Sequence, residues 1–352
     1  MIDRTRLLLL FFMLFLPLAA MAQQERATPK SGEGISAFLE RNGRAGKAYY
    51  KEFLKLNANR LRGKEELRLG VKYVLPPLTA GKKAADGKGG KDGKDEEAVR
   101  TDGKGKKFVN EPLFGKELAR VEVTSNRLRG ACFYVVSGHG GPDPGAIGKV
   151  GKRELHEDEY AYDVALRLAR NLMQEGAEVH IVIQDAKDGI RDEAYLSNSK
   201  RETCMGAAIP LNQVERLKQR CAKINELYRK DRKTHKYCRA IFLHVDSRSK
   251  SAQTDVFFYH APKSVLGKKL AVTMKETFES KYGKHQPNRG FEGTVSARNL
   301  YVLLNASPTA VFVELGNIQN TFDQRRFVIS SNRQALAKWM MEGFIADYKR
   351  AK

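Results

Sequence analysis

The stretch Cys132-Phe133-Tyr134-Val135-Val136-Ser137-Gly138-His139-Gly140-Gly141 decides how the C-terminal part of the chain folds. Its first six residues form an apolar run that is typical of a strand. The glycines that follow let the backbone turn sharply, which brings the imidazole of His139 toward a ligand. A polar side chain with metal-binding chemistry therefore stands just past the end of a predicted strand.

The same alternation of strands and helices continues to the C-terminus. Apolar strands that alternate with amphipathic helices predict an α/β fold, with a mostly parallel twisted sheet flanked by helices on both faces. We expect strands at residues 132–137, 178–183, 240–245, 256–259, 301–304 and 310–315, and helices at 160–172, 214–228, 265–282 and 334–348.

Further polar residues stand at or near the ends of these strands, where such sheets bind their ligands. His244 follows Ile241-Phe242-Leu243, and Glu314 interrupts an apolar run. An unpaired carboxylate there would be costly, so Glu314 needs a nearby cation or a raised pKa. The alternatives are a buried structural histidine and a salt bridge to an arginine. Together with the acidic run Glu154 to Glu159, the pattern favours a hydrolytic zinc site.

Several motifs in the same region follow one another in the order of a known family. Residues 108–352 resemble the zinc-dependent N-acetylmuramoyl-L-alanine amidases of the Amidase_3 family. The motifs are Gly138 to Gly148, Leu217-Lys218-Gln219-Arg220 with Asn225, Phe242-Leu243-His244, Asn288-Arg289-Gly290 with Leu300 to Leu303, and Val313 to Asn320.

The resemblance implies a catalytic zinc ion held by two histidines and one glutamate. His139 and His244 match the two histidines. The glutamate begins the first helix of the family's domain, and here Glu154, Glu157 and Glu159 are the candidates. We choose Glu157, because a helix that starts one turn early puts it on the apolar face; Glu159 and Glu154 are the reserves. His156 is expected at the surface or beside the ligands.

The resemblance also implies the reaction, which is hydrolysis of the amide between N-acetylmuramic acid and L-alanine in peptidoglycan. Glu314 matches the catalytic glutamate, which takes a proton from water and passes it to the leaving amine. Asn288 and Arg289 match the neighbourhood of substrate contact, and Asp246 could orient His244 or bind polar substrate groups. The alternatives are another zinc peptidase that acts on wall peptides and a non-catalytic peptidoglycan-binding protein.

The N-terminus predicts export. Arg4 and Arg6 precede an apolar stretch from Leu7 to Leu18, and Ala20-Met21-Ala22 resembles a cleavage site, so residues 1–22 are expected to be a signal peptide. The stretch is short for a stable membrane span, although an uncleaved anchor is the alternative. We expect an exported protein that is periplasmic or associated with the cell envelope.

Two segments separate the signal peptide from the catalytic domain. Residues 29–77 resemble a LysM module, a small βααβ glycan-binding fold, through Ser31 to Ser36, Leu54 to Asn57 and Leu69 to Pro76. A structural or partner-docking domain is the alternative. Residues 78–107 are rich in Gly, Lys and Asp and nearly lack apolar side chains, so we expect a disordered linker.

Charge and cysteine content bear on partners. The 352 residues carry a formal charge of +22, spread without the clustering of a nucleic-acid surface, so anionic envelope material is the expected partner rather than nucleic acid. A protein activator is a further candidate partner. Cys132, Cys204, Cys221 and Cys238 allow one or two disulfides after export, or are buried thiols.

An insertion between Gln184 and Arg216 is expected to shape or restrain access to the site.

Overall fold

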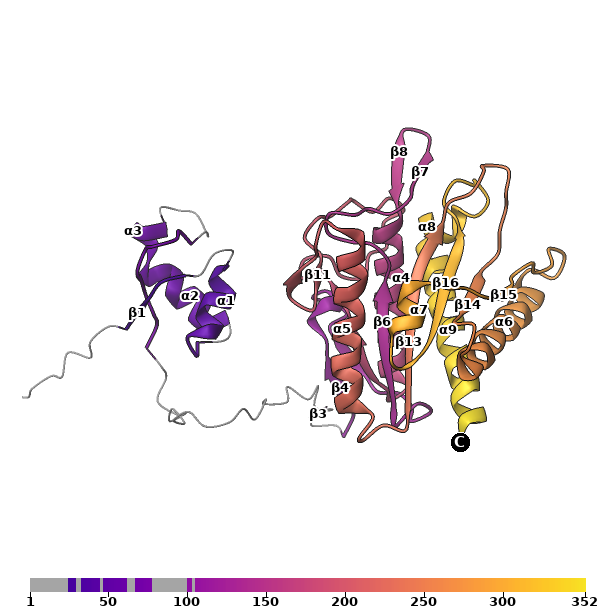
Figure 1. Ribbon diagram of the computed structural model, residues 1–352, viewed down its shortest axis with the longest axis horizontal. Helices are drawn as coiled ribbons and strands as arrows, with labels where there is room; N and C mark the ends of the chain where they lie inside the picture. Colours follow the sequence, from indigo (N-terminus) through magenta and orange to yellow (C-terminus); the bar gives the residue numbers. More distant parts are fainter. Residues whose placement is uncertain (1–24, 30–32, 45–46, 62–66, 78–99, 103–104) are drawn as a thin grey trace, which may run out of the picture. The chain divides into compact units, whose positions relative to one another are not determined.

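The computed structural model describes residues 25–29, 33–44, 47–61, 67–77, 100–102 and 105–352 (Figure 1). The predicted signal peptide and most of the predicted linker lie outside these residues. The chain divides into two compact units, Met1–Gly93 and Lys94–Lys352. Among the described residues, no helix has the length and apolar composition needed to cross a bilayer.

The first unit has the order strand, helix, helix, strand, with one short additional helix. β1 and β2 pair antiparallel around a core in which Phe38, Phe53 and Tyr73 form mutual ring contacts, with centroids 5.7 to 6.2 Å apart. The side chain of Asn57 bonds to both backbone groups of Val74 and ties the helices to β2. β1 lies before the predicted start at residue 29. The elements are β1 (Arg26–Ala27), α1 (Ile35–Arg41), α2 (Lys47–Leu56), α3 (Ala58–Leu61) and β2 (Tyr73–Val74).

The second unit is built on a six-stranded sheet in the order β15-β14-β16-β13-β6-β9. All neighbouring strands are parallel except β14 and β16, which are antiparallel. The predicted mostly parallel sheet is therefore confirmed. Its strands are β6 (Ala131–Ser137), β9 (Glu178–Ile181), β13 (Tyr237–Asp246), β14 (Phe257–His260), β15 (Val295–Ala297) and β16 (Thr309–Asn317).

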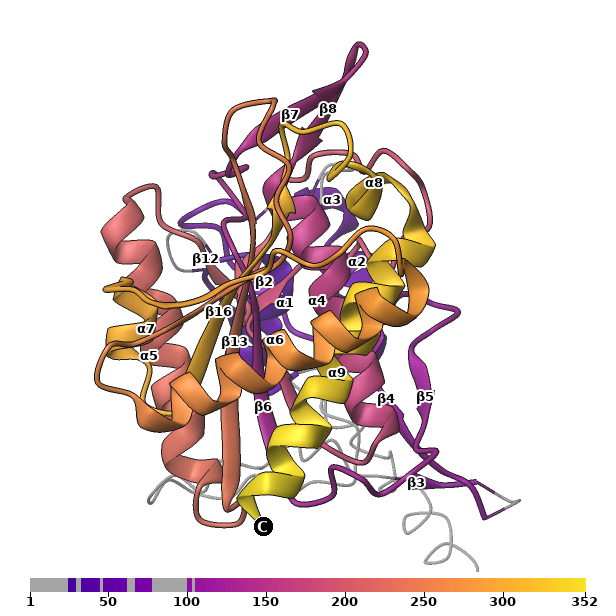
Figure 2. The same ribbon diagram turned by 90° about the vertical axis from the view of Figure 1, so that its right-hand side faces the viewer.

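Helices cover both faces of this sheet (Figure 2). Successive strand residues point to opposite faces, so Phe133 and Val135 pack with α4, α6 and α9 in one core, whereas Tyr134 and Val136 pack with α5 and α7 in the other. The helices are α4 (Glu157–Gln174), α5 (Gln213–Asp231), α6 (Val265–His285), α7 (Tyr301–Asn305), α8 (Arg325–Val328) and α9 (Ser330–Ala351).

The predicted strand at residues 301–304 is wrong, because this segment forms α7. In a strand, Val302 and Leu303 would face opposite sides, but one helical turn lets both pack into the core beside α5. Leu304 is left 54% exposed. The side chain of Asn225 on α5 fixes the end of the turn by bonding to Asn305 and Ser307.

Residues 100, 101 and 107 of the predicted linker take part in strands. β3 pairs antiparallel with β4, and Asp102 accepts bonds from the backbone of Lys106 and the guanidinium of Arg120. These contacts offset the loss of chain entropy that made the stretch look disordered. The remaining elements are β3 (Arg100–Thr101), β4 (Lys107–Asn110), η1 (Pro112–Phe114), β5 (Arg120–Glu122), β7 (Ile147–Val150), β8 (Arg153–His156), β10 (Ile183–Gln184), β11 (Thr203–Cys204) and β12 (Ala207–Ala208).

Candidate metal centre

Four predicted site residues meet at the carboxyl ends of the strands of the central sheet. His139 follows β6, His244 lies near the end of β13, Glu314 lies in β16, and Glu157 is the first residue of α4. His244 and Glu314 are direct partners in the parallel register of β13 and β16, so their side chains share one face of the sheet. The ring of His244 stacks on Phe312 of β16, with centroids 4.4 Å apart.

The backbone around His139 is shaped for close approach. His139 itself has φ of 54°, a left-handed conformation that is uncommon for a residue with a side chain. A Cβ atom on Gly138 would lie 2.3 Å from the ring of His244, and one on Gly145 would lie 2.7 Å from both Glu157 and His139. The glycines therefore make room for the two imidazoles and the carboxylate to converge.

Glu157 is the centre of this cluster. Its Oε1 atom lies 3.2 Å from Nε2 of His139, 3.0 Å from Nδ1 of His244 and 3.0 Å from the backbone nitrogen of Val245. Its Oε2 atom accepts a bond from the backbone nitrogen of Ala146 at 2.8 Å. One ligand atom from each of Glu157, His139 and His244 lies within 4.8 Å of the others.

The two reserve glutamates lie elsewhere. Glu159 forms an ion pair with Arg191 at 2.9 Å and accepts a bond from the backbone of Ser199. Glu154 is on the β7–β8 hairpin, where it lies 3.4 Å from both Lys149 and His156. Of the three candidate glutamates, Glu157 is the one that the fold brings to the two histidines.

Residues outside the predicted set position His139. Asp143 lies 2.9 Å from its Nδ1 atom and forms an ion pair with Arg216 of α5 at 2.7 Å. Arg220, on the same helix, donates a bond to the backbone oxygen of His139. A carboxylate on one ring nitrogen leaves the other nitrogen free to face a metal. The sequence gives Asp143 within the Gly138 to Gly148 motif, but its pairing with Arg216 depends on the fold.

The electrostatics of the cluster fit a cation. Burial would lower the pKa of His139, but its bonds to Asp143 and Glu157 outweigh burial and raise the pKa to about 10. Burial would likewise raise the pKa of Glu157, but the bonds to His139 and His244 hold it well below its usual range. Burial lowers the pKa of His244 against the opposing effect of Glu157. One carboxylate oxygen thus faces a ring nitrogen of each histidine.

The pKa of Glu314 is raised, whereas that of Glu157 is lowered. Its Oε2 atom is buried and lacks a hydrogen-bond partner among the described residues. Burial raises the pKa of Glu314 well above its usual value, and the negative charges of Glu157 and Asp246 raise it further. A carboxylate with a raised pKa and a free oxygen beside two histidines has the properties of a general base.

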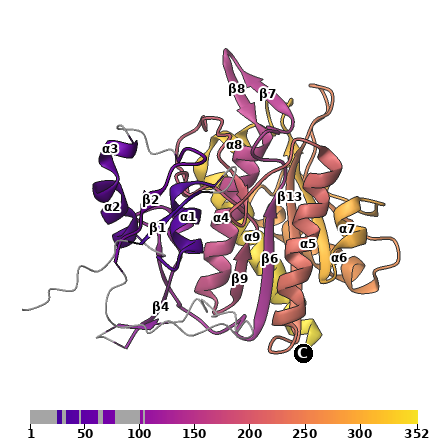
Figure 3. The same ribbon diagram turned by 60° about the vertical axis from the view of Figure 1, so that its left-hand side comes forward.

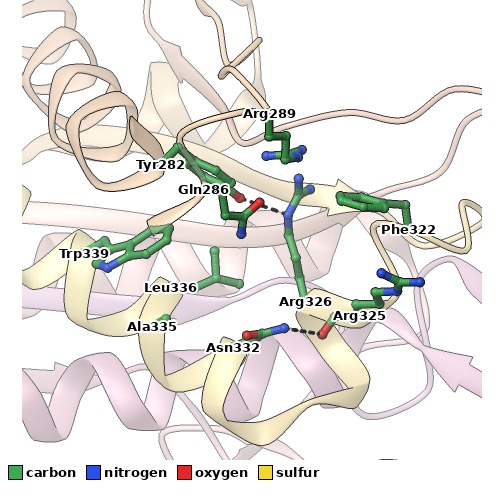
Figure 4. A pocket seen from close by; sticks show the side chains of 10 residues that line it. All are labelled: Tyr282, Gln286, Arg289, Phe322, Arg325, Arg326, Asn332, Ala335, Leu336 and Trp339. Carbon is green, nitrogen blue, oxygen red and sulfur yellow. Dashed lines mark hydrogen bonds between the residues drawn. The ribbon is translucent and has the colours of Figure 1, made fainter. Parts of the chain in front are cut away.

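The three predicted substrate-contacting residues lie in different surroundings. Asp246 is paired with Arg248 and acts on Glu314 through its charge. Asn288 is exposed. Arg289 forms an ion pair with Asp255 and lies over the rings of Tyr282 and Phe322, in a pocket that contains none of the four cluster residues (Figure 4). Substrate contact by these residues stays a prediction.

The insertion between Gln184 and Arg216 packs against the loop that carries His139. Glu202 accepts a bond from the backbone nitrogen of Gly141 at 2.8 Å, and a Cβ atom on Gly141 would lie 3.1 Å from Ile209. The insertion therefore supports the candidate metal centre from one side. Its predicted influence on substrate access stays a hypothesis, which unchanged activity on purified peptidoglycan after its deletion would refute.

The fold and the cluster together define an α/β protein with a candidate hydrolytic metal centre at the carboxyl edge of its sheet. Residues 134–346 match the Amidase_3 family, described as N-acetylmuramoyl-L-alanine amidase. This match spans more than half of the chain, and the chain belongs to that family. It is thereby placed among the peptidoglycan amidases.

Three solved structures are among those similar to the chain. An N-acetylmuramoyl-L-alanine amidase from Clostridium difficile 630 is 20% identical with a TM-score of 0.45, over 62% of this chain and 96% of that one. AmiC2 of Nostoc punctiforme is 19% identical with a TM-score of 0.43, over 64% and 99%. The CwlD amidase from Clostridioides difficile, solved in complex with the GerS lipoprotein, is 15% identical with a TM-score of 0.45, over 62% and 98%. No curated protein matches the chain.

Proposed function

We propose that the chain is a zinc-dependent N-acetylmuramoyl-L-alanine amidase that cuts stem peptides from peptidoglycan. The observation that carries this proposal is the position of Glu314. Its carboxylate, whose buried Oε2 atom has no hydrogen-bond partner among the described residues, lies opposite His244 in the sheet register, beside a carboxylate that two histidines share. A structural cluster would have no use for a buried carboxylate with a free oxygen, whereas hydrolysis needs one.

The residues present fit a zinc ion. Nitrogen and oxygen ligands at 2.0–2.1 Å around a tetrahedral ion lie about 3.3 Å apart. The separations of 3.2 and 3.0 Å between Glu157 and the two histidines are close to this value. His139, Glu157 and His244 would hold the ion and leave one position open. A zinc ion bound there lowers the pKa of water and polarises a carbonyl.

The protein residues then have distinct tasks. Asp143 holds the Nδ1 atom of His139 and so fixes the direction of Nε2. Glu314 takes the proton of the attacking water and returns it to the nitrogen of L-alanine as the amide bond breaks. The pKa of Glu314, raised by burial, makes it a stronger base than an exposed glutamate.

The other parts of the chain would bind glycan and direct the protein to its substrate. The first unit would bind glycan as a LysM-like module, and the linker would let the catalytic domain work within reach of that attachment. The signal peptide would direct the protein to the periplasm or cell envelope, where it remodels the wall or separates daughter cells. A protein activator would control it; the CwlD amidase offers a precedent for a protein partner in its complex with GerS.

Digestion of purified peptidoglycan tests the proposal. The full chain is incubated with and without a chelator, and products are identified by mass. We expect intact stem peptides with a free L-alanine amine and stem-free glycan strands, and no products when chelator is present. Cleavage within the stem would indicate a wall peptidase instead, and binding without products would indicate a non-catalytic protein.

A further inference from the structure

A second cluster of metal-ligating side chains lies at the opposite edge of the central sheet. Cys132 is near the start of β6, Glu178 and His180 are on β9, and Asp231 is the last residue of α5. One ligand atom from each of these four residues lies within 4.8 Å of the others. His139 is seven positions after Cys132, which is about 20 Å along a strand, so the two clusters are distinct. Figure 3 shows α5 running alongside β6 and β13.

One ring nitrogen in the cluster faces more acceptors than its single hydrogen can serve. Nε2 of His180 lies 3.0 Å from Asp231 Oδ2 and 3.4 Å from Glu178 Oε1, although a ring nitrogen carries at most one hydrogen. The same Asp231 oxygen also accepts hydrogen bonds from Tyr134 Oη at 2.8 Å and from Cys132 Sγ at 3.6 Å. This convergence resembles that at Glu157 in the first centre.

Three of the separations in the cluster are close to those between ligands of one ion. Around a tetrahedral zinc ion, nitrogen and oxygen ligands lie about 3.3 Å apart, and sulfur and oxygen ligands about 3.5 Å apart. The measured separations are 3.0 and 3.4 Å from His180 to the carboxylates, and 3.6 Å from Cys132 to Asp231. All four ligand atoms lie within 4.8 Å of one another, so a cation among them would draw the wider pairs together.

The surroundings of the cluster favour a bound cation. Asp231 ends α5, and the C-terminus of a helix carries partial negative charge. Tyr134 stacks on the ring of His180 with centroids 5.5 Å apart and donates its hydroxyl to Asp231, which fixes two of the four side chains. His235 lies 3.3 Å from Glu178 and fixes a third. Ligating groups held by such neighbours are typical of protein metal sites.

We propose that Cys132, Glu178, His180 and Asp231 form a second, structural metal site of the zinc class. A thiolate, an imidazole and two carboxylates make four protein ligands and leave no open position, as in structural rather than catalytic zinc sites. The ion would tie β6, β9 and the end of α5 together, and it takes no part in hydrolysis. The site is independent of the proposed amidase activity.

A disulfide is the competing use of the same cysteine. Cys132 and Cys238 are direct partners in the register of β6 and β13. Both are free, buried thiols in the structure, as are Cys204 and Cys221. Oxidation of Cys132 with Cys238 would remove the thiolate ligand, so the two alternatives exclude each other.

Cobalt spectroscopy on the full chain distinguishes them. The protein is purified without reductant, stripped of metal, and titrated with Co²⁺. The first centre has only nitrogen and oxygen ligands, so a thiolate-to-cobalt charge-transfer band reports the second site alone. We expect about two metal ions per chain in the wild type and about one in Cys132→Ser, with the band lost. Cys204→Ser, which removes another buried thiol, should keep both ions and the band.

Two further variants keep the test decisive. His180→Gln changes a partly exposed ligand and should lower the metal content to about one ion even if Cys132→Ser does not fold. His139→Ala should lose one ion and keep the band. One ion per chain without a band in the wild type, or a Cys132–Cys238 disulfide found by mass analysis, overturns the proposal.

Discussion

Replacing Gly138 by alanine tests whether close packing fixes the position of His244. The added Cβ would lie 2.3, 2.5 and 2.6 Å from Cε1, Nδ1 and Nε2 of that ring. Carbon atoms in contact lie about 3.5 Å apart, so the ring must move by about 1 Å. A displacement of that size at a reacting centre costs roughly 100-fold in rate. We expect Gly138→Ala to lose about 100-fold in kcat/KM and to bind zinc more weakly.

The assay measures release of soluble fragments from labelled peptidoglycan, together with zinc titration of the metal-free protein. Gly283→Ala is the matched control, because its Cβ would meet no atom within 4 Å. It lies in α6, where alanine is favoured over glycine by up to about 1 kcal/mol. Circular dichroism verifies that both variants fold. If folded Gly138→Ala keeps wild-type turnover and zinc affinity, the argument from close packing is refuted.

Three further predictions follow from charges near the metal centre. Asp143→Asn removes the carboxylate that orients His139, so zinc affinity measured by competition with a chelator should fall about 10–100-fold, and an unchanged affinity would contradict the positioning role. Asp246→Asn removes a negative charge that raises the pKa of Glu314, so the acidic limb of the kcat/KM profile should move to lower pH rather than stay fixed. Burial, with the charges of Glu159 and Glu202, raises the pKa of Asp158 from 3.8 to about 8. The stability that its protonated form contributes is therefore present below pH 3.8 and is lost as the pH rises through about 8. Asp158→Asn should flatten the corresponding fall in the Tm of the metal-free protein, and an unaltered pH dependence of Tm would count against that shift.

The central sheet could be predicted from the sequence because its strands are buried on both faces. Such strands are continuous apolar runs, and β6, β13 and β16 each stand out in this way. The short segment at residues 301–304 is also apolar, but it is too short for periodicity to distinguish a strand from a helical turn. Only its packing against α5 decides for a helix.

The candidate site was predictable to the extent that its residues end strands or begin a helix. His139, His244 and Glu314 are polar residues at or near the ends of apolar runs. Glu157 could be chosen because a helix that starts one turn before residue 160 puts it on the apolar face, and α4 does begin at Glu157. The positioning role of Asp143 was not predictable in the same way. It depends on Arg216, 73 residues later in the chain, and on the fold that places α5 beside the His139 loop.

The roles of substrate-contacting residues are the least accessible to sequence reasoning. Arg289 stands in a recognisable motif, but whether it faces the metal centre depends on the path of the segment between α6 and β15. In the structure its guanidinium forms an ion pair with Asp255. It also lies over the ring of Tyr282 (Figure 4). A motif identifies such a residue without giving the direction of its side chain.

The central claim is that Glu314 is the base of a zinc amidase, and Glu314→Gln tests it most directly. The measurement is the rate of stem-peptide release from purified peptidoglycan, at zinc occupancies matched between variant and wild type. The account predicts full zinc binding with a loss of about 100- to 10,000-fold in kcat, because general base catalysis contributes that much. Turnover within a few-fold of wild type at equal zinc occupancy would contradict it.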